Sequence, residues 1–86
     1  MDPSMESFRE KLETEYTFPS LYMFKFIVPN QQVEQVESLF PKAETQTKPS
    51  KNGKYISVTA KIMAHSSDQI VDIYLAAHKI DGIISL

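Results

Sequence analysis

The sequence predicts an α+β domain in which four antiparallel strands form one sheet and two helices cover one of its faces. Three observations lead to this prediction. A hairpin signal precedes a long alternating strand within residues 48–62, an aromatic and β-branched run fills residues 21–28, and stretches with helical apolar spacing separate the strands. The 86 residues leave room for one small domain with a thin core.

The hairpin is centred on Asn52-Gly53, the pair most favoured for a two-residue type I′ turn, because both central residues of that turn need a positive φ. The turn fixes a register in which Lys51 faces Lys54, and the apolar or small pairs share one face: Pro49/Ile56, Thr47/Val58, Thr45/Ala60 and Ala43/Ile62. The polar pairs Lys48/Ser57, Gln46/Thr59 and Glu44/Lys61 share the other face. The first arm, residues 42–49, is polar and contains a proline, so it is predicted to be an edge strand, and the second arm, residues 54–64, is predicted to be central.

The first helix is predicted to run from a cap at Asp2-Pro3 to about Glu15, with Met5, Phe8 and Leu12 on a narrow apolar stripe. This stripe either covers the helix's own domain or serves as an arm that binds a partner. Phe18-Pro19 breaks the helix, because the residue before proline avoids the α region. The sequence therefore divides into an N-terminal helical extension, residues 1–17, and a single domain, residues 18–86.

The run from residue 21 to residue 28 is predicted to be a buried central strand, with Lys25 on its less buried face. Asn30 is predicted to cap a short amphipathic helix that ends before Pro41. Ser66 and Gln69 form a capping box for a second amphipathic helix, and Asp81-Gly82 supplies its C-terminal stop. Residues 83–86 form the last short strand.

After the leading helix, the predicted order of strand, helix, strand, strand, helix, strand is the ferredoxin-like pattern. Right-handed crossovers then give the strand order 4-1-3-2 in the sheet. Both helices are predicted to pack over Tyr22, Phe24, Phe26, Ile56, Val58 and Ile62. The opposite face is predicted to be open, and it carries Met23, Lys25, Ile27, Tyr55, Ser57, Thr59, Lys61 and Met63.

Composition argues against several classes of function. The formal net charge of −2 does not favour non-specific binding to nucleic acid or to anionic membranes, although Lys48, Lys51 and Lys54 cluster at the hairpin. RNA-recognition domains stack bases on aromatic side chains of two central strands, whereas the open face offers Tyr55 alone, so nucleic-acid binding is not expected. The chain contains no cysteine, no signal peptide and no apolar run of about 18 residues, which fits a soluble protein of the cytoplasm.

The sequence predicts neither a metal site, a cofactor nor catalysis. His65 and His78 are far apart in the chain and have no other ligand type at metal-binding spacing. The serines have no recognisable general base, and each of the two glycines has a turn role, so no glycine-rich phosphate loop is present. We therefore expect the chain not to be an enzyme.

Several segments together resemble the YbeD-like family of small bacterial domains: Phe18-Pro19, Phe24-Lys25-Phe26, the run from Lys48 to Thr59, Ile73-Tyr74, and Ile84-Ser85-Leu86. The most specific part is Ser-x-x-Gly-Lys-Tyr-x-Ser-Val-Thr, starting at Ser50. The resemblance implies a cytoplasmic ferredoxin-like domain of unestablished function whose fold is similar to that of amino-acid-sensing ACT regulatory domains. The sequence departs from the family where Pro29-Asn30 replaces a glycine after the first strand, which counts against small-molecule sensing.

These observations predict a non-enzymatic regulatory or protein-interaction domain that acts through a sheet edge or the open face. The alternative is an ACT-like sensor of an amino acid or metabolite, with the ligand held between two protomers near Asn30 and the first helix. The partner is either another protein or a second copy of the chain. The candidate surface consists of Lys25, Asn30, Lys48, Lys51, Lys54, Tyr55 and Lys61.

Overall fold

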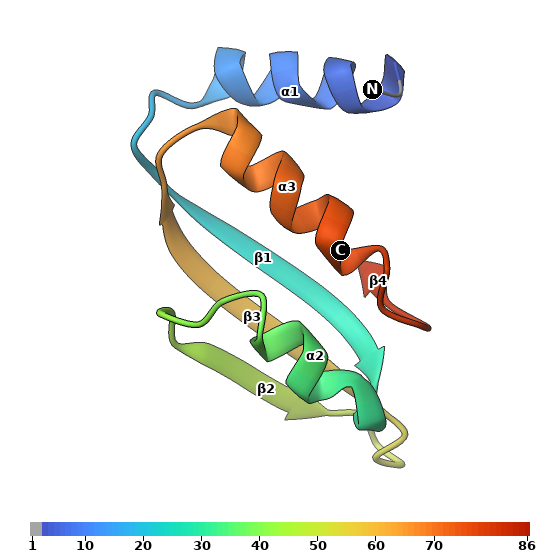
Figure 1. Ribbon diagram of the computed structural model, residues 1–86. Coiled ribbons are helices and arrows are strands. Elements are labelled where there is room, and N and C mark those ends of the chain that lie inside the picture. The colour runs from blue at the N-terminus through green and yellow to red at the C-terminus, as the bar shows by residue number, and fades with distance from the viewer. Residues whose placement is uncertain (1–2) are drawn as a thin grey trace.

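The computed structural model describes residues 3–86 and contains a four-stranded antiparallel sheet with helices on one side (Figure 1). Along the chain, the elements are α1 (Pro3–Glu15), β1 (Ser20–Pro29), the 3₁₀ helix η1 (Asn30–Gln32), α2 (Val33–Glu37), β2 (Thr45–Pro49), β3 (Tyr55–Ala64), α3 (Ser67–Ala77) and β4 (Ile84–Ser85). The predicted cap at Asp2 lies outside the described residues. The α+β, ferredoxin-like class with a preceding helix is confirmed.

The strands lie in the order β2-β3-β1-β4, which is the predicted order. β1 and β3 pair along their whole length, from Ser20 opposite Ala64 to Pro29 opposite Tyr55. β2 pairs with β3 in the predicted register, with Thr47 opposite Val58. β4 pairs only with Phe26 and Ile27 of β1, so the edge of β1 from Ser20 to Phe24 has no strand beside it among the described residues.

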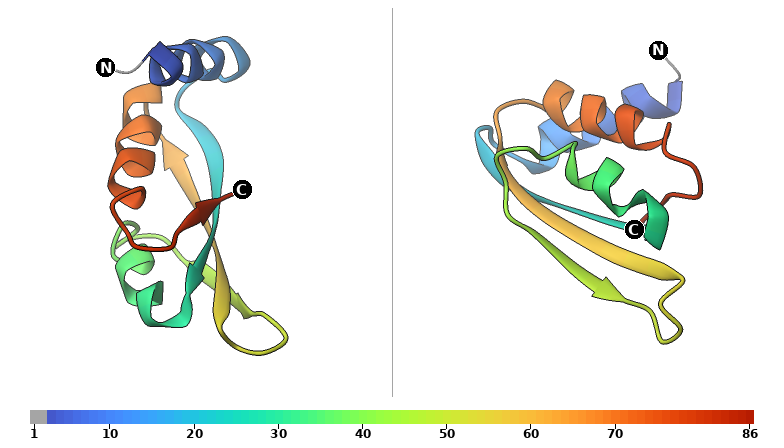
Figure 2. Two further views of the ribbon diagram at one scale, coloured as in Figure 1. Left: turned by 90° about the vertical axis from the view of Figure 1, so that its right-hand side faces the viewer. Right: turned by 60° about the horizontal axis from the view of Figure 1, so that its bottom comes forward.

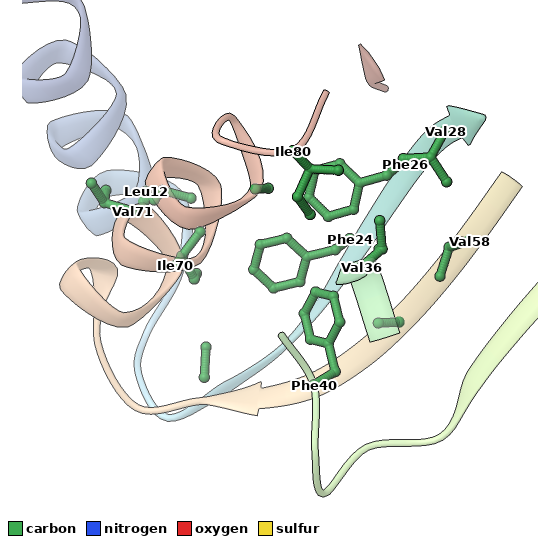
Figure 3. Close-up of a cluster of buried hydrophobic side chains, with 13 residues drawn as sticks. Leu12, Phe24, Phe26, Val28, Val36, Phe40, Val58, Ile70, Val71 and Ile80 are labelled. Carbon is green, nitrogen blue, oxygen red and sulfur yellow. The ribbon is translucent and has the colours of Figure 1, made fainter. Parts of the chain in front are cut away.

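The core lies between the sheet and the helical layer of α2 and α3 (Figure 2). Phe24, Phe26 and Val28 alternate on the inner face of β1 and are fully buried, as the period of a strand requires. Phe40 packs its ring against both phenylalanines of β1, at centroid distances of 5.2 and 6.5 Å (Figure 3). Val36, Ile70 and Val71 close this core from the helical side.

The first helix covers its own domain by packing against α3, at the end of the helical layer (Figure 1). Leu12 is buried, and the ring of Phe8 meets Tyr74 edge-on at 5.5 Å. Arg9 forms an ion pair with Asp68 at 2.9 Å, and the hydroxyl of Ser67 donates to Glu13 Oε1 at 2.8 Å. The apolar stripe of α1 is therefore occupied, and the opposite face of the sheet stays uncovered by it.

The predicted type I′ turn is wrong, although the register it implied is right. Gly53 has φ +72°, but no residue other than glycine has a positive φ among the described residues, so Asn52 does not adopt the conformation a type I′ turn needs. The amide of Gly53 donates to the carbonyl of Ser50 at 3.0 Å, and the amide of Ser50 donates to the carbonyl of Tyr55 at 2.8 Å. The connection is thus a four-residue loop closed by Ser50 and Tyr55.

Two predictions about helix ends are also wrong. The side chain of Asn30 does not cap the following helix; its Nδ2 donates to the carbonyl of Gly53 at 2.8 Å and so holds the hairpin loop. α3 ends at Ala77, and Asp81-Gly82 lies beyond it in a turn where Gly82 has φ +76°. The capping box is confirmed: Ser66 Oγ accepts from the amide of Gln69 at 3.2 Å, and Gln69 Oε1 accepts from the amide of His65 at 2.8 Å.

Candidate protein-binding face

The side of the sheet away from the helices carries no other element among the described residues (left view of Figure 2). Strand register determines which side chains it presents, because opposite residues of a ladder point to the same side. We call this surface the open face, and it consists of Leu21, Met23, Lys25, Ile27, Gln46, Lys48, Tyr55, Ser57, Thr59, Lys61, Met63 and Ile84. All four strands contribute to it.

Large apolar side chains gather on the open face. Seven large hydrophobic side chains are exposed in the described part of the chain, and five of them belong to this surface: Leu21, Met23, Tyr55, Met63 and Ile84. Their exposed fractions range from 47% for Tyr55 to 60% for Leu21. On the helical layer, Leu75 of α3 is a large apolar side chain that is also exposed, at 42%. Since isolated exposed apolar residues are ordinary, the gathering on one face is the informative observation.

The apolar side chains form two groups, with lysines between and beside them. Leu21 lies opposite Met63, next to Met23, at one end of the β1–β3 ladder. At the other end, Ile27 lies opposite both Ser57 and Ile84. Lys25, which lies opposite Thr59, separates these groups along β1, and Lys61 lies opposite Met23, beside the first group; we call these two lysines the basic band.

Lysine is the charged residue of the open face. Lys25, Lys48 and Lys61 are exposed there, and its other positions carry no charge. Lys25 and Lys48 border a shallow hollow of about 530 Å³ whose other lining side chains are Gln46, Thr47, Ser57 and Thr59. The one ion pair within 4.0 Å among the described residues joins Arg9 to Asp68 on the helical side. The three lysines of the open face therefore point their charge at solvent.

The structure brings only part of the predicted candidate surface together. Lys25, Lys48, Tyr55 and Lys61 share the open face. Lys51 and Lys54 lie in the hairpin loop, at the end of the sheet, and are exposed. Asn30 is bound to that loop through Gly53, so it belongs with the loop and not with the open face. Sequence reasoning missed Ile84, because the run of residues 83–86 has no alternation that would assign its two sides.

The buried titratable side chains serve packing. The hydroxyl of Tyr22 lies 3.1 Å from that of Tyr74, within the aromatic cluster. Burial, followed by this hydrogen bond, raises the pKa of Tyr22 well above its ordinary value, so the hydroxyl keeps its proton into alkaline solution. The described residues contain no group of three or more His, Asp or Glu side chains placed to hold a metal ion. They also include no helix of the length and apolar character needed to span a membrane.

A family described as a protein of unknown function, DUF493, matches residues 13–86. This range includes all four strands and the helices α2 and α3. No curated protein and no solved structure matches the chain. Most of α1, up to Leu12, lies outside the matched range. The chain belongs to the DUF493 family, which is the YbeD-like family of domains of unknown function.

Proposed function

We propose that this chain is a non-enzymatic protein-interaction domain with a regulatory role, and that its open face binds the partner. The observation that carries the proposal is the gathering of five exposed apolar side chains on one side of the sheet. Large apolar side chains gathered on one face mark interaction sites in soluble proteins, because leaving them in water is unfavourable. On the helical side, the apolar stripe of α1 is already covered, since α1 packs on α3.

The unpaired edge of β1 supports a second route for the same partner. β4 ends the pairing at Phe26, so the backbone from Ser20 to Phe24 is free of a neighbouring strand on that side among the described residues. A strand supplied by a partner can hydrogen-bond to such an edge. The edge runs beside Leu21 and Met23, so edge pairing and contact with the open face are compatible.

The test compares two variants that remove exposed apolar surface at two different places. The double variant Met23→Ser and Met63→Ser removes apolar surface from the open face, and Leu75→Ser removes it from α3. All three side chains are more than 40% exposed, so the fold is expected to survive. In affinity capture from a native lysate, the wild type and Leu75→Ser are expected to recover the same partner and the double variant to lose it. Equal recovery by all three proteins would rule out the open face as the site.

A second candidate function is the sensing of a small molecule, and one hollow favours it. Between the segment after α2 and the start of α3, a groove of about 460 Å³ is lined by apolar side chains, among them Ile62 and Ile73, together with Lys42 and His65. Apolar walls with a few polar groups are typical of ligand sites, and the basic groups suit a carboxylate. This groove lies away from Asn30, where the sequence placed the ligand.

A thermal-shift screen with amino acids and related carboxylic acids separates the two candidates. A ligand that binds only the folded state raises the melting temperature, and at 100 times its dissociation constant it adds about 2.7 kcal/mol to the free energy of unfolding. No shift at millimolar concentration would exclude sensing of those compounds. A shift that is abolished by Lys42→Ala would place the ligand in the groove.

A further inference from the structure

We propose that the partner segment that binds the open face is acidic, with carboxylates placed between two apolar anchors. This inference rests on the proposed function and adds the chemistry of the partner. Three observations carry it: the sign of the charge on the open face, the position of that charge between the two apolar groups, and the contrast with the rest of the molecule.

The charge of the open face is opposite to that of the whole chain. The chain has nine basic and eleven acidic residues, for a net charge of −2. The open face holds three of the basic residues, Lys25, Lys48 and Lys61, and none of the acidic ones. Glu44, predicted to lie opposite Lys61, precedes β2 and is not part of the paired sheet. The remaining residues therefore hold six basic and eleven acidic side chains, a net charge of −5. A molecule with such a distribution attracts an anionic surface to one side and repels it from the others.

The basic band lies close to the apolar groups, so a partner that contacts both groups also contacts the lysines. Met23 and Ile27 are four residues apart on β1, which corresponds to about 13 Å along the strand. Lys25 is halfway between them, and Lys61 lies beside Met23 on β3. An extended partner would satisfy this pattern with apolar side chains four residues apart and a carboxylate between them. A helical partner would need about nine residues to cover the same distance.

A second copy of the chain is the less suitable occupant. In a face-to-face dimer, the same patch of both copies meets itself, so the lysines of one open face would lie against those of the other. Like charges placed together at an interface are costly. Nucleic acid is also less suitable, because the open face presents one aromatic ring, that of Tyr55, beside thioether and aliphatic side chains, whereas single strands are held by stacking on several rings.

The test uses charge reversal with a matched control. Lys25→Glu with Lys61→Glu reverses the band, and Lys11→Glu with Lys79→Glu makes the same change in net charge at exposed positions on the helical side. The probes are a fluorescent peptide that repeats Leu-Ser-Glu-Ser, so that leucine and glutamate alternate on one face when it is extended, its glutamine counterpart, and a single-stranded RNA of 12 nucleotides. Binding is followed by fluorescence anisotropy at low and at high salt, and the same variants are used for affinity capture.

We expect the acidic peptide to bind the wild type at least about tenfold more tightly than the glutamine peptide. We also expect that advantage to shrink at high salt, to vanish in the Lys25/Lys61 variant and to persist in the Lys11/Lys79 variant. If captured partner is lost with the Met23/Met63 variant but retained with the Lys25/Lys61 variant, the acidic partner is refuted while the protein-interaction function stands. If neither the Met23/Met63 variant nor the Lys25/Lys61 variant affects capture, the acidic partner and the binding of a protein at the open face are both refuted.

Two other results would overturn the inference in favour of another occupant. Tighter binding of the RNA than of the acidic peptide, with the same dependence on Lys25 and Lys61, would assign the face to nucleic acid. A stable dimer of the wild type in light scattering that dissociates in the Met23/Met63 variant would assign it to a second copy.

Discussion

The two glycines differ in what a side chain would cost at each position: backbone strain alone at Gly53, and backbone strain with a steric clash at Gly82. Both adopt the left-handed conformation, but a Cβ on Gly53 would meet nothing within 4 Å, whereas a Cβ on Gly82 would lie 2.9 Å from Cγ of Pro29. We expect Gly53→Ala to lower the free energy of unfolding by about 1–2 kcal/mol, the cost of the left-handed backbone. Gly82→Ala should lower it further. Urea denaturation measures both, and equal losses would show that Pro29 moves aside freely.

The hydroxyl pair of Tyr22 and Tyr74 predicts a loss of stability in alkali. Burial and this hydrogen bond raise the pKa of Tyr22 in the folded state, so the folded state holds its proton more tightly than the unfolded state does. The stabilisation is complete below the ordinary tyrosine pKa of about 10 and is lost progressively as the pH rises above it. Urea unfolding between pH 8 and pH 11 should therefore show a steeper loss for the wild type than for Tyr22→Phe. Parallel curves would contradict the assignment.

At the scale of elements, the hairpin shows why a register can be predicted when a loop conformation cannot. A two-residue and a four-residue loop centred on Asn52-Gly53 give the same pairs, so Thr47 meets Val58 in either case. The loop itself depends on contacts from elsewhere. Ser50 Oγ accepts from the amide of Tyr55, and Asn30, far away in the sequence, donates to the carbonyl of Gly53. Local propensity contains no information about that second contact.

The helices show the same limit. Strand order and the two faces followed from apolar spacing and from the polar edge, because burial determines both. The end of α2 could not be predicted from apolar spacing. The amides of Leu39 and Phe40 donate to carbonyls three residues earlier, so the chain tightens into a 3₁₀-type turn before Pro41. Apolar spacing alone does not distinguish such a turn from a regular helix.

The contact between α1 and α3 predicts unequal effects of two substitutions. Leu12 is buried, so Leu12→Ala should lower the free energy of unfolding by about 2–5 kcal/mol, through lost apolar burial and the cavity left behind. Asp68→Asn removes the partner of Arg9, but its side chain is 66% exposed, and the loss should stay below about 1 kcal/mol. Urea denaturation checks both. A loss below 1 kcal/mol for Leu12→Ala would mean that α1 is held loosely.

On the scale of the whole molecule, the sequence located the open face but not its full composition. Alternation within β1 and β3 predicted eight of its side chains, among them Met23, Tyr55 and Met63. β4, which adds Ile84, follows a turn in which Gly82 lies close to Pro29. That is a tertiary contact between segments distant in the sequence.

The basic band also predicts how the molecule avoids pairing with itself. Lys25 separates the two apolar groups of the open face, Lys61 borders the first of them, and both lysines repel a second copy. We expect the wild type to have the mass of one chain in light scattering. The variant Lys25→Met with Lys61→Met should associate as concentration rises, because its apolar surface is continuous. Lys11→Met with Lys79→Met provides the control, and association of both variants to the same extent would contradict a specific role for the band.

The placement of the tyrosines makes the molecule its own optical probe. The chain has four tyrosines and no tryptophan, so its near-ultraviolet emission comes from tyrosine alone. Tyr16, Tyr22 and Tyr74 lie in one aromatic cluster, whereas Tyr55 stands apart on the open face, 47% exposed. A Tyr55→Phe variant therefore isolates the contribution of a single ring. Quenching by iodide would then report, without any attached label, whether the open face is in contact with water or covered.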